Sequence, residues 1–458
     1  MILGAPFEAF VQAAPISVMM QGLLENTFNP QRIDEIFEQE AESQYTRILS
    51  FSTVADLLSE VVFHISPSVG AAIATNIEEI NVSRKSVYNK LNGVEPQVSA
   101  ALVHETVEHF VPVIDELDAV ADEPLSGYRV KILDGNHFSA TEHRLLELRD
   151  LADAPLPGKA LVVFDPQLSL ATNVIPCEDG HAQERALLED VLPLVETDDL
   201  WVGDRNFCTL GFIFGIDQRD GFFLFRQHGN VCGTLLGERQ FQGSTETGDV
   251  YEQSLRLTCP QTGQFLMVRR ITVELYQPTR NGEKVIHLLT NVPVSDATPI
   301  QIAELYRNRW SIETMFQQLT ETLTCEIKTL AYPKAAILAF CLALVAYNGI
   351  SVVKTALCAV HGREIVDNEV SGYYMSLEIA KTYTGMMIAI ADENWRVFRD
   401  LTATELAEIL KELAKQVVLS KYQKHPRGPK KPKPKRTKMS EGNHVSTARI
   451  LVRRTRKN

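Results

Sequence analysis

Two short segments with alternating apolar residues, each ending at an aspartate, constrain the fold of this 458-residue chain most. Apolar side chains occupy every second position of residues 128–134, which end at Asp134, and of residues 200–204, which end at Asp204. A period of two is typical of β-strands. Ligands of open α/β sheets lie beyond the carboxyl ends of strands, so both carboxylates are candidates for one site.

A well-marked helix start follows at Thr298. Thr298 can cap the helix, Pro299 takes its first position, and Gln301 completes a capping box. The apolar spacing then predicts one helix over residues 298–323. At 100° per residue, three polar side chains fall within an arc of about 60° beside the apolar stripe: Tyr306, Arg309 and Glu313.

This combination of side chains suits phosphoryl transfer. A guanidinium presents a planar fork to a phosphate, and carboxylates offer the hard oxygen ligands that Mg²⁺ prefers. Two metal ions about 3.5–4 Å apart would screen three carboxylates and clamp the attacking and leaving oxygens. We therefore predict that Asp134, Asp204 and Glu313 bind metal, and that Tyr306 and Arg309 contact phosphate.

These motifs resemble those of DDE transposases, and within them insertion-sequence family four. YRNRWSIETMF is similar to the tyrosine-arginine-glutamate part of that family's signature, and GDRNF is similar to the sequence around its second aspartate. The resemblance covers about residues 128–353. The signature's fourth position, a lysine separated from Glu313 by six residues, is Thr320 here. Thr320 is predicted to contact DNA, because its hydroxyl can hydrogen-bond a phosphate oxygen, but it lacks the charge. Lys328 could supply that charge from further along the chain. Arg205 could contact DNA or pair with an acid.

The resemblance implies an α/β fold with a ribonuclease-H-like catalytic core and a β-strand insertion. It implies metal-dependent cleavage at transposon ends and strand transfer into target DNA, with two Mg²⁺ ions for which Mn²⁺ substitutes. It further implies a homodimer on paired ends, acting in the bacterial cytoplasm. A flipped base, if one forms, would need an aromatic receiver in the insertion, where three candidates occur: Phe241, Tyr251 and Tyr276.

Composition and periodicity divide the chain into five parts. They are a helical DNA-binding region at 1–125, a catalytic domain at 126–357 with an insertion at 221–292, a helical region at 358–420, and a basic tail at 421–458. The tail has fourteen Lys or Arg and one acid, whereas the whole chain has a net charge of −13, so the rest is strongly acidic. This proline-rich, charged tail is predicted to be disordered when free and to contact phosphates.

Residues 71–80 and the segment that begins at Ser83 resemble a helix-turn-helix with a basic second helix. Four of its side chains would then contact DNA: Arg84, Lys85, Asn89 and Lys90. An ordinary helical hairpin with a solvated face explains the same pattern.

Several classes are not supported by the sequence. The longest apolar run, residues 335–347, is shorter than the roughly 18 residues of a membrane span and indicates a core helix. The seven cysteines have no metal-binding spacing, and no phosphate-loop motif indicates a nucleotide cofactor. Two alternatives to a transposase stay open: a metal-dependent nuclease of the same core without strand transfer, and a non-catalytic DNA-binding descendant.

Overall fold

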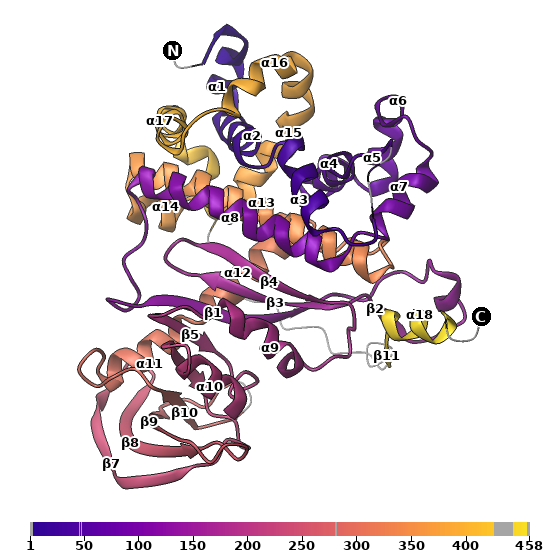
Figure 1. Cartoon of the computed structure of the whole chain (residues 1–458). Helices are drawn as coiled ribbons and strands as arrows, with labels where there is room; N and C mark the ends of the chain where they lie inside the picture. Colours follow the sequence, from indigo (N-terminus) through magenta and orange to yellow (C-terminus); the bar gives the residue numbers. More distant parts are fainter. Residues whose placement is uncertain (1–2, 45, 47, 280–281, 426–442, 456–458) are drawn as a thin grey trace.

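The fold is built on one mixed sheet of nine strands, in the order β4-β3-β1-β5-β6-β10-β9-β8-β7. The structure is a computed structural model, and it describes residues 3–44, 46, 48–279, 282–425 and 443–455. Helices from the N-terminal region and from residues 333–414 lie together over one side of the sheet (Figure 1). The chain therefore has an α/β fold with a large mixed sheet.

Five strands form the half of the sheet that the helices cover. β1 is antiparallel to β3 and parallel to β5, β3 is antiparallel to β4, and β5 is parallel to β6. Apolar residues at nearly every position of β3 and β5 explain why both strands are buried. The bounds are β1 (Arg129–His137), β3 (Lys159–Asp165), β4 (Leu170–Cys177), β5 (Asp199–Gly203) and β6 (Phe222–Arg226).

The predicted insertion continues this sheet without a break. β10 pairs with β6 and with β9, and β8 and β7 follow, all antiparallel. The predicted start of the insertion at residue 221 is too early, because β6 pairs with β5 as a strand of the inner half. The added strands are β7 (Thr234–Ser244), β8 (Gly248–Thr258), β9 (Phe265–Leu275) and β10 (Val285–Thr290).

The helical layer contains the N-terminal region, which is helical as predicted. α8 (Pro96–Leu117) and α13 (Pro333–His361) pack against each other and against β4. α13 is long and apolar enough to cross a membrane, but 94% of its most apolar window is buried inside the protein, as expected of a core helix. The other N-terminal helices are α1 (Glu8–Ala13), α2 (Pro15–Thr27), α3 (Pro30–Glu40), α4 (Phe51–Val62), α5 (Val69–Thr75), α6 (Ile77–Ile80) and α7 (Arg84–Leu91).

The region after α13 is also helical, and α15 and α17 pack on the N-terminal helix α2. This contact joins the N-terminal region and the region after α13 into one helical layer (Figure 1). The helices are α14 (Arg363–Glu369), α15 (Gly372–Ala389), α16 (Asp392–Trp395) and α17 (Ala403–Ala414). Two short helices, α9 (Leu188–Val191) and α10 (Leu210–Asp217), flank β5 in sequence.

The predicted helix over residues 298–323 is two helices, α11 (Pro299–Asn308) and α12 (Trp310–Thr322). The capping box of Thr298 and Gln301 is present. Arg309 lies at the junction with φ −49° and ψ −29°, close to helical values. The face that carries the polar residues is therefore nearly continuous across the break.

The structure corrects the prediction of disorder for residues 444–455 of the tail. β11 (His444–Ser446) pairs in parallel with β2 (Ala154–Leu156), and α18 (Thr447–Thr455) follows. Ile450 and Leu451 pack against a small apolar cluster, which supplies the burial that the composition of the tail did not suggest. Residues 426–442, the most basic part of the tail, lie outside the described residues.

Candidate active site

The sheet brings the two aspartates to the same edge. β1 and β5 run in parallel, and Leu133 is the register partner of Gly203. The next residue on each strand is Asp134 or Asp204, so the two carboxylates follow from adjacent positions of neighbouring strands. Both side chains are half-buried. The alternating pattern of the sequence predicted this placement.

Glu313 reaches the same place from α12, which contacts β1. Arg309 connects the two elements, because its Nη1 lies 3.3 Å from Asp134 Oδ2 and its Nη2 lies 3.0 Å from Glu313 Oε1. Arg309 is only 8% exposed, and its Nε has no hydrogen-bond partner among the described residues. A buried donor is thus left over for a ligand.

The electrostatics show that the three acids influence one another. Burial raises the pKa of Asp134 to about 6; Arg309 and the Gly135 N–H oppose this shift, while the charges of Asp204 and Glu313 add to it. For Arg309, burial disfavours the charge, but the nearby negative groups outweigh it and its pKa is raised. The site therefore has three carboxylates and one guanidinium, a surplus of negative charge.

These carboxylates have the chemistry that a divalent metal needs, since hard anionic oxygens are the preferred ligands of Mg²⁺. Among the described residues, however, no three His, Cys, Asp or Glu side chains are grouped as a metal site. Arg309 provides a physical reason, because its guanidinium bonds to the oxygens of Asp134 and Glu313. The three carboxylates can therefore bind a metal ion if Arg309 releases its bonds to Asp134 and Glu313.

Tyr306 lies beside this group, with its ring centroid 5.9 Å from the guanidinium carbon of Arg309. Burial raises the pKa of Tyr306 to about 12, although Arg309 and Arg226 oppose the shift. The phenol therefore stays protonated at neutral pH and can donate a hydrogen bond. Its position beside Arg309 suits a phosphate contact.

The two other predicted DNA contacts near the acids already have partners. Arg205 is exposed and pairs with Glu283 at 3.3 Å, and Glu283 also pairs with Arg226 at 2.6 Å. The exposed Thr320 on α12 donates its hydroxyl to the Phe316 carbonyl at 2.9 Å. Neither arrangement prevents a contact with DNA, but each would have to rearrange to make one.

The aromatic candidates of the insertion lie on or next to its strands. Phe241 is 60% exposed and packs edge-on against Tyr251 at a centroid distance of 5.4 Å. Arg239 lies 4.0 Å above the Tyr251 ring. Tyr276 is exposed and donates its hydroxyl to Asp249. Nothing in these contacts selects one of the three as a base receiver.

The predicted helix-turn-helix forms helices α5, α6 and α7, with Asn81 in the left-handed region at the turn. Arg84, Lys85 and Asn89 are exposed on α7. The prediction for Lys90 is corrected, because Lys90 is only 8% exposed and its ammonium lies 4.3 Å from the centroid of the Phe37 ring. Lys90 therefore packs inside the helical layer, whereas the other three can meet a partner.

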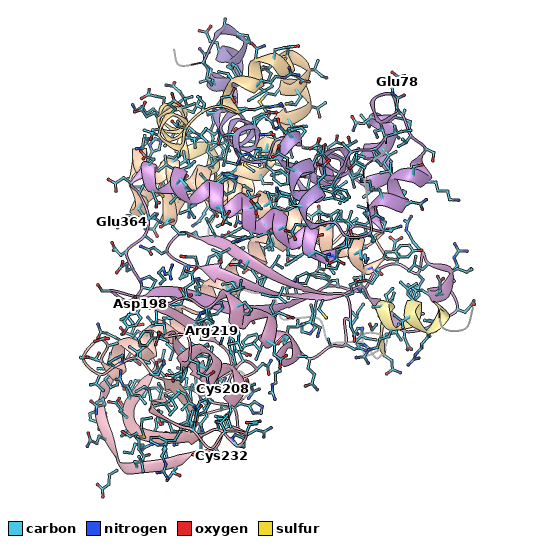
Figure 2. All side chains as sticks on the ribbon, viewed as in Figure 1. Glu78, Asp198, Cys208, Arg219, Cys232 and Glu364 are labelled. Carbon is cyan, nitrogen blue, oxygen red and sulfur yellow. The ribbon has the colours of Figure 1, made fainter. Side chains whose placement is uncertain are left out.

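The thiols take no part in this site. All seven cysteines are free. Burial raises the pKa of the Cys208 thiol to about 11, so it stays protonated. Figure 2 labels Cys208 and the exposed Cys232.

No sequence motif singled out Glu184. Its side chain contacts His137 at the end of β1 and Asn206 in the turn after β5. Glu184 lies in the connection between β4 and β5, where no periodic pattern marks it.

Comparisons with known proteins agree with this geometry. Residues 126–348 match the family model described as "Transposase DDE domain". The chain is also similar to the "Putative transposase y4zB" of Sinorhizobium fredii, with 24% identity over 168 residues. That match covers 36% of this chain and 44% of the relative, so the chain spans less than half of the relative's length. Together the two matches support a DDE transposase, and the matched domain contains Asp134, Asp204 and Glu313.

Proposed function

We propose that this protein is a cut-and-paste DNA transposase whose metal-binding carboxylates are Asp134, Asp204 and Glu313. The observation that carries the proposal is the convergence of these acids. Asp134 and Asp204 directly follow the last paired residues of the parallel β1–β5 ladder, and Arg309 bonds Glu313 to Asp134. The inner five strands, with parallel β1, β5 and β6, support a ribonuclease-H-like core.

Two Mg²⁺ ions held by the three acids, or Mn²⁺ in their place, would activate the attacking oxygen and stabilise the leaving one. The residues of the chain then position the DNA. Arg309 has a buried Nε donor and a planar fork for a phosphate, and Tyr306 beside it donates a hydroxyl. Arg205 and Thr320 flank the acids and contact the DNA backbone on either side.

The partners follow from this activity. The protein binds transposon ends and target DNA, works as a homodimer on two ends, and acts in the bacterial cytoplasm. Arg84, Lys85 and Asn89 on α7 contribute to recognition of the end, because they are exposed on the second helix of the helix-turn-helix. The basic residues of the tail add contacts to phosphates that do not depend on sequence.

The decisive experiment is Mg²⁺-dependent cleavage of a DNA fragment carrying the element's own end. The wild type is compared with Glu313→Gln, which keeps the shape and removes the charge, and with Glu321→Gln, an exposed acid on the same helix, as the control. We expect Glu313→Gln to bind the DNA but to lose cleavage, and Glu321→Gln to cleave normally.

Strand transfer is then tested with pre-cut ends and a target plasmid. Cleavage without joining would identify a nuclease of the same core. Binding by the wild type without cleavage would contradict the proposed activity and identify a DNA-binding descendant.

A further inference from the structure

A side chain from a third segment contacts the chain just after both aspartates. Glu184 begins a short 3₁₀ helix, Glu184–Leu187, in the connection between β4 and β5. Its Oε1 lies 3.5 Å from His137 Nδ1 at the end of β1. Its Oε2 accepts a hydrogen bond from Asn206 Nδ2 at 3.4 Å, in the turn after β5. One carboxylate therefore contacts both the end of β1 and the turn after β5.

Asn206 links Glu184 to Asp204, because it hydrogen-bonds to both. The Asn206 N–H donates to Asp204 Oδ1 at 2.6 Å, which fixes the direction of that carboxylate. The Asn206 carbonyl accepts from Arg185 Nε at 3.1 Å. Glu184 and Arg185 thus hold the side chain and the main chain of the residue that orients Asp204.

On β1, the contact is with the backbone next to Asp134. The Gly135 N–H donates to Asp134 Oδ1 at 2.9 Å. A Cβ added at Gly135 would lie 2.4 Å from Glu184 Oε1 and 2.7 Å from its carboxyl carbon. Glu184 therefore packs directly on the peptide that orients Asp134, and a larger residue at position 135 would displace its carboxylate.

The segment that carries Glu184 is itself fixed. Lys159 is 4% exposed, lies 3.1 Å from His137 Nε2 through its Nζ, and donates to the Ala182 carbonyl. Arg449 of α18 bonds to Asp179 Oδ2 through two nitrogens, both at 2.8 Å. The side chain of Glu184 is only 14% exposed, so it is held between these anchors.

We propose that Glu184 is a positioning residue, which holds Asp134 and Asp204 in one arrangement through Gly135 and Asn206. The inference rests on the proposed function, because it concerns how the carboxylates are presented to metal. Removal of a group that orients a metal ligand commonly weakens metal binding by about 10–100-fold.

The test measures Mn²⁺ affinity of the DNA-free full chain by titration calorimetry. We expect Glu184→Ala to weaken Mn²⁺ binding about tenfold. Glu184→Gln should recover most of this loss, because its amide oxygen can still accept from Asn206. Glu189→Ala, a change of an exposed acid a few residues away, is the control and should bind Mn²⁺ as the wild type does. DNA-end binding and the thermal unfolding midpoint should stay near wild type in all three.

A second variant tests whether Glu184 acts on Asp204 through Asn206. It also provides a measurement that does not depend on the folding of Glu184→Ala. Asn206 is exposed, so Asn206→Ala removes the link at little risk to the core. If Glu184 acts on Asp204 through Asn206, the loss in Mn²⁺ affinity of the double variant should be clearly smaller than the sum of the two single losses. Fully additive losses, or unchanged Mn²⁺ affinity in Glu184→Ala, would overturn the inference.

The two proposals fail in different ways. If wild-type Mn²⁺ binding does not depend on Asp134, Asp204 and Glu313, the proposed function fails and the inference about Glu184 fails with it. If binding depends on those acids but not on Glu184, the inference alone is overturned.

Discussion

Arg309 Nη1 lies 3.3 Å from Asp134 Oδ2, so a cation of the protein occupies an oxygen that the proposed metal would need. Arg309 also bonds to Glu313, and it has one buried donor to spare. A phosphate could accept that donor and draw the guanidinium away from the acids. DNA binding and metal binding would then favour each other.

The first prediction concerns Arg309→Gln. Without the guanidinium, Mn²⁺ should bind the DNA-free protein about tenfold more tightly, since a competing charge about 3–4 Å away is gone. Cleavage of end DNA should nevertheless fall about a hundredfold, because a charged phosphate contact is lost. Calorimetry and a cleavage time course measure the two effects. Arg307→Gln, which removes an exposed partner of Glu246, is the control. Unchanged Mn²⁺ affinity would refute the competition.

The second prediction is a pH dependence of stability that originates at Asp134. Burial raises the pKa of its folded-state carboxyl from 3.8 to about 6, so the folded state binds the proton more tightly than the unfolded state. The stabilisation is complete below about pH 4 and disappears as the pH rises through 6. The free energy of unfolding should fall by on the order of 2–3 kcal/mol across this range. Asp134→Asn removes this dependence.

Urea unfolding of the wild type and Asp134→Asn, at several pH values in metal-free buffer, measures the difference. Equal slopes against pH in the two proteins would show that Asp134 does not titrate in this way. Mg²⁺ should restore stability to the wild type at pH 7 and have little effect on Asp134→Asn, because a cation would replace the proton.

The third prediction separates two roles on α7. Lys85→Ala and Asn89→Ala should each weaken binding to end DNA by about 1–3 kcal/mol if they contact it, with no loss of stability, because both side chains are exposed. Lys90→Ala should instead lower the free energy of unfolding by about 1 kcal/mol, since its ammonium and stem pack on Phe37. Fluorescence anisotropy and urea unfolding distinguish the two outcomes. End-DNA binding that survives both surface changes would favour an ordinary helical hairpin.

The fourth prediction is a gain of function. Thr320 is exposed on α12, and its hydroxyl donates to the Phe316 carbonyl and lies 4.0 Å from Cys325 Sγ. Thr320→Lys therefore adds a positive charge and removes only this long sulfur contact outside the helix. Cleavage should become severalfold faster, and the gain should shrink at high salt because it is electrostatic. Thr314→Lys, about 100° away from Glu313 on the same helix, serves as the control. Equal gains in both variants would indicate a nonspecific effect of charge.

The fifth prediction concerns the basic residues of 426–442. Replacing its seven Lys and Arg by Gln keeps the length of the segment and leaves β11 and α18 intact. The slope of log affinity against log salt should decrease by up to about 6, because fewer counterions are released. Filter binding over a series of salt concentrations provides the slope. A slope equal to that of the wild type would show that these residues stay away from the DNA.

The sequence predicted the placement of Asp134 and Asp204 because the cause is local. Alternation marks both strands, and parallel pairing places the two aspartates next to each other. The predicted end of the first strand at Asp134 was wrong, because pairing with β3 continues β1 to His137. The capping box at Thr298 is equally local and was confirmed. The short break at Arg309 escaped prediction because no proline or glycine marks it.

The remaining errors depend on contacts between distant segments. Lys90 looks like a surface residue in sequence, and only the position of Phe37 from α3 buries it. Residues 444–446 form a strand because β2 offers an edge roughly three hundred positions earlier in the chain. Glu184 acquires its neighbours from the ends of β1 and β5. Periodicity carries no information on any of these partners.

The continuous ladder from β5 through β6 and β10 to β9 has a mechanical consequence. β6 and β10 pair at three positions, so backbone hydrogen bonds tie the outer strands to the strands that carry the aspartates. The outer strands are therefore less free to move relative to Asp134 than a domain on a flexible hinge would be. A duplex that touches both places must adapt its own shape, and steps that kink or unstack easily would do so at the lowest energy. Selection among DNA ends could then reflect how readily each deforms, in addition to which bases it presents.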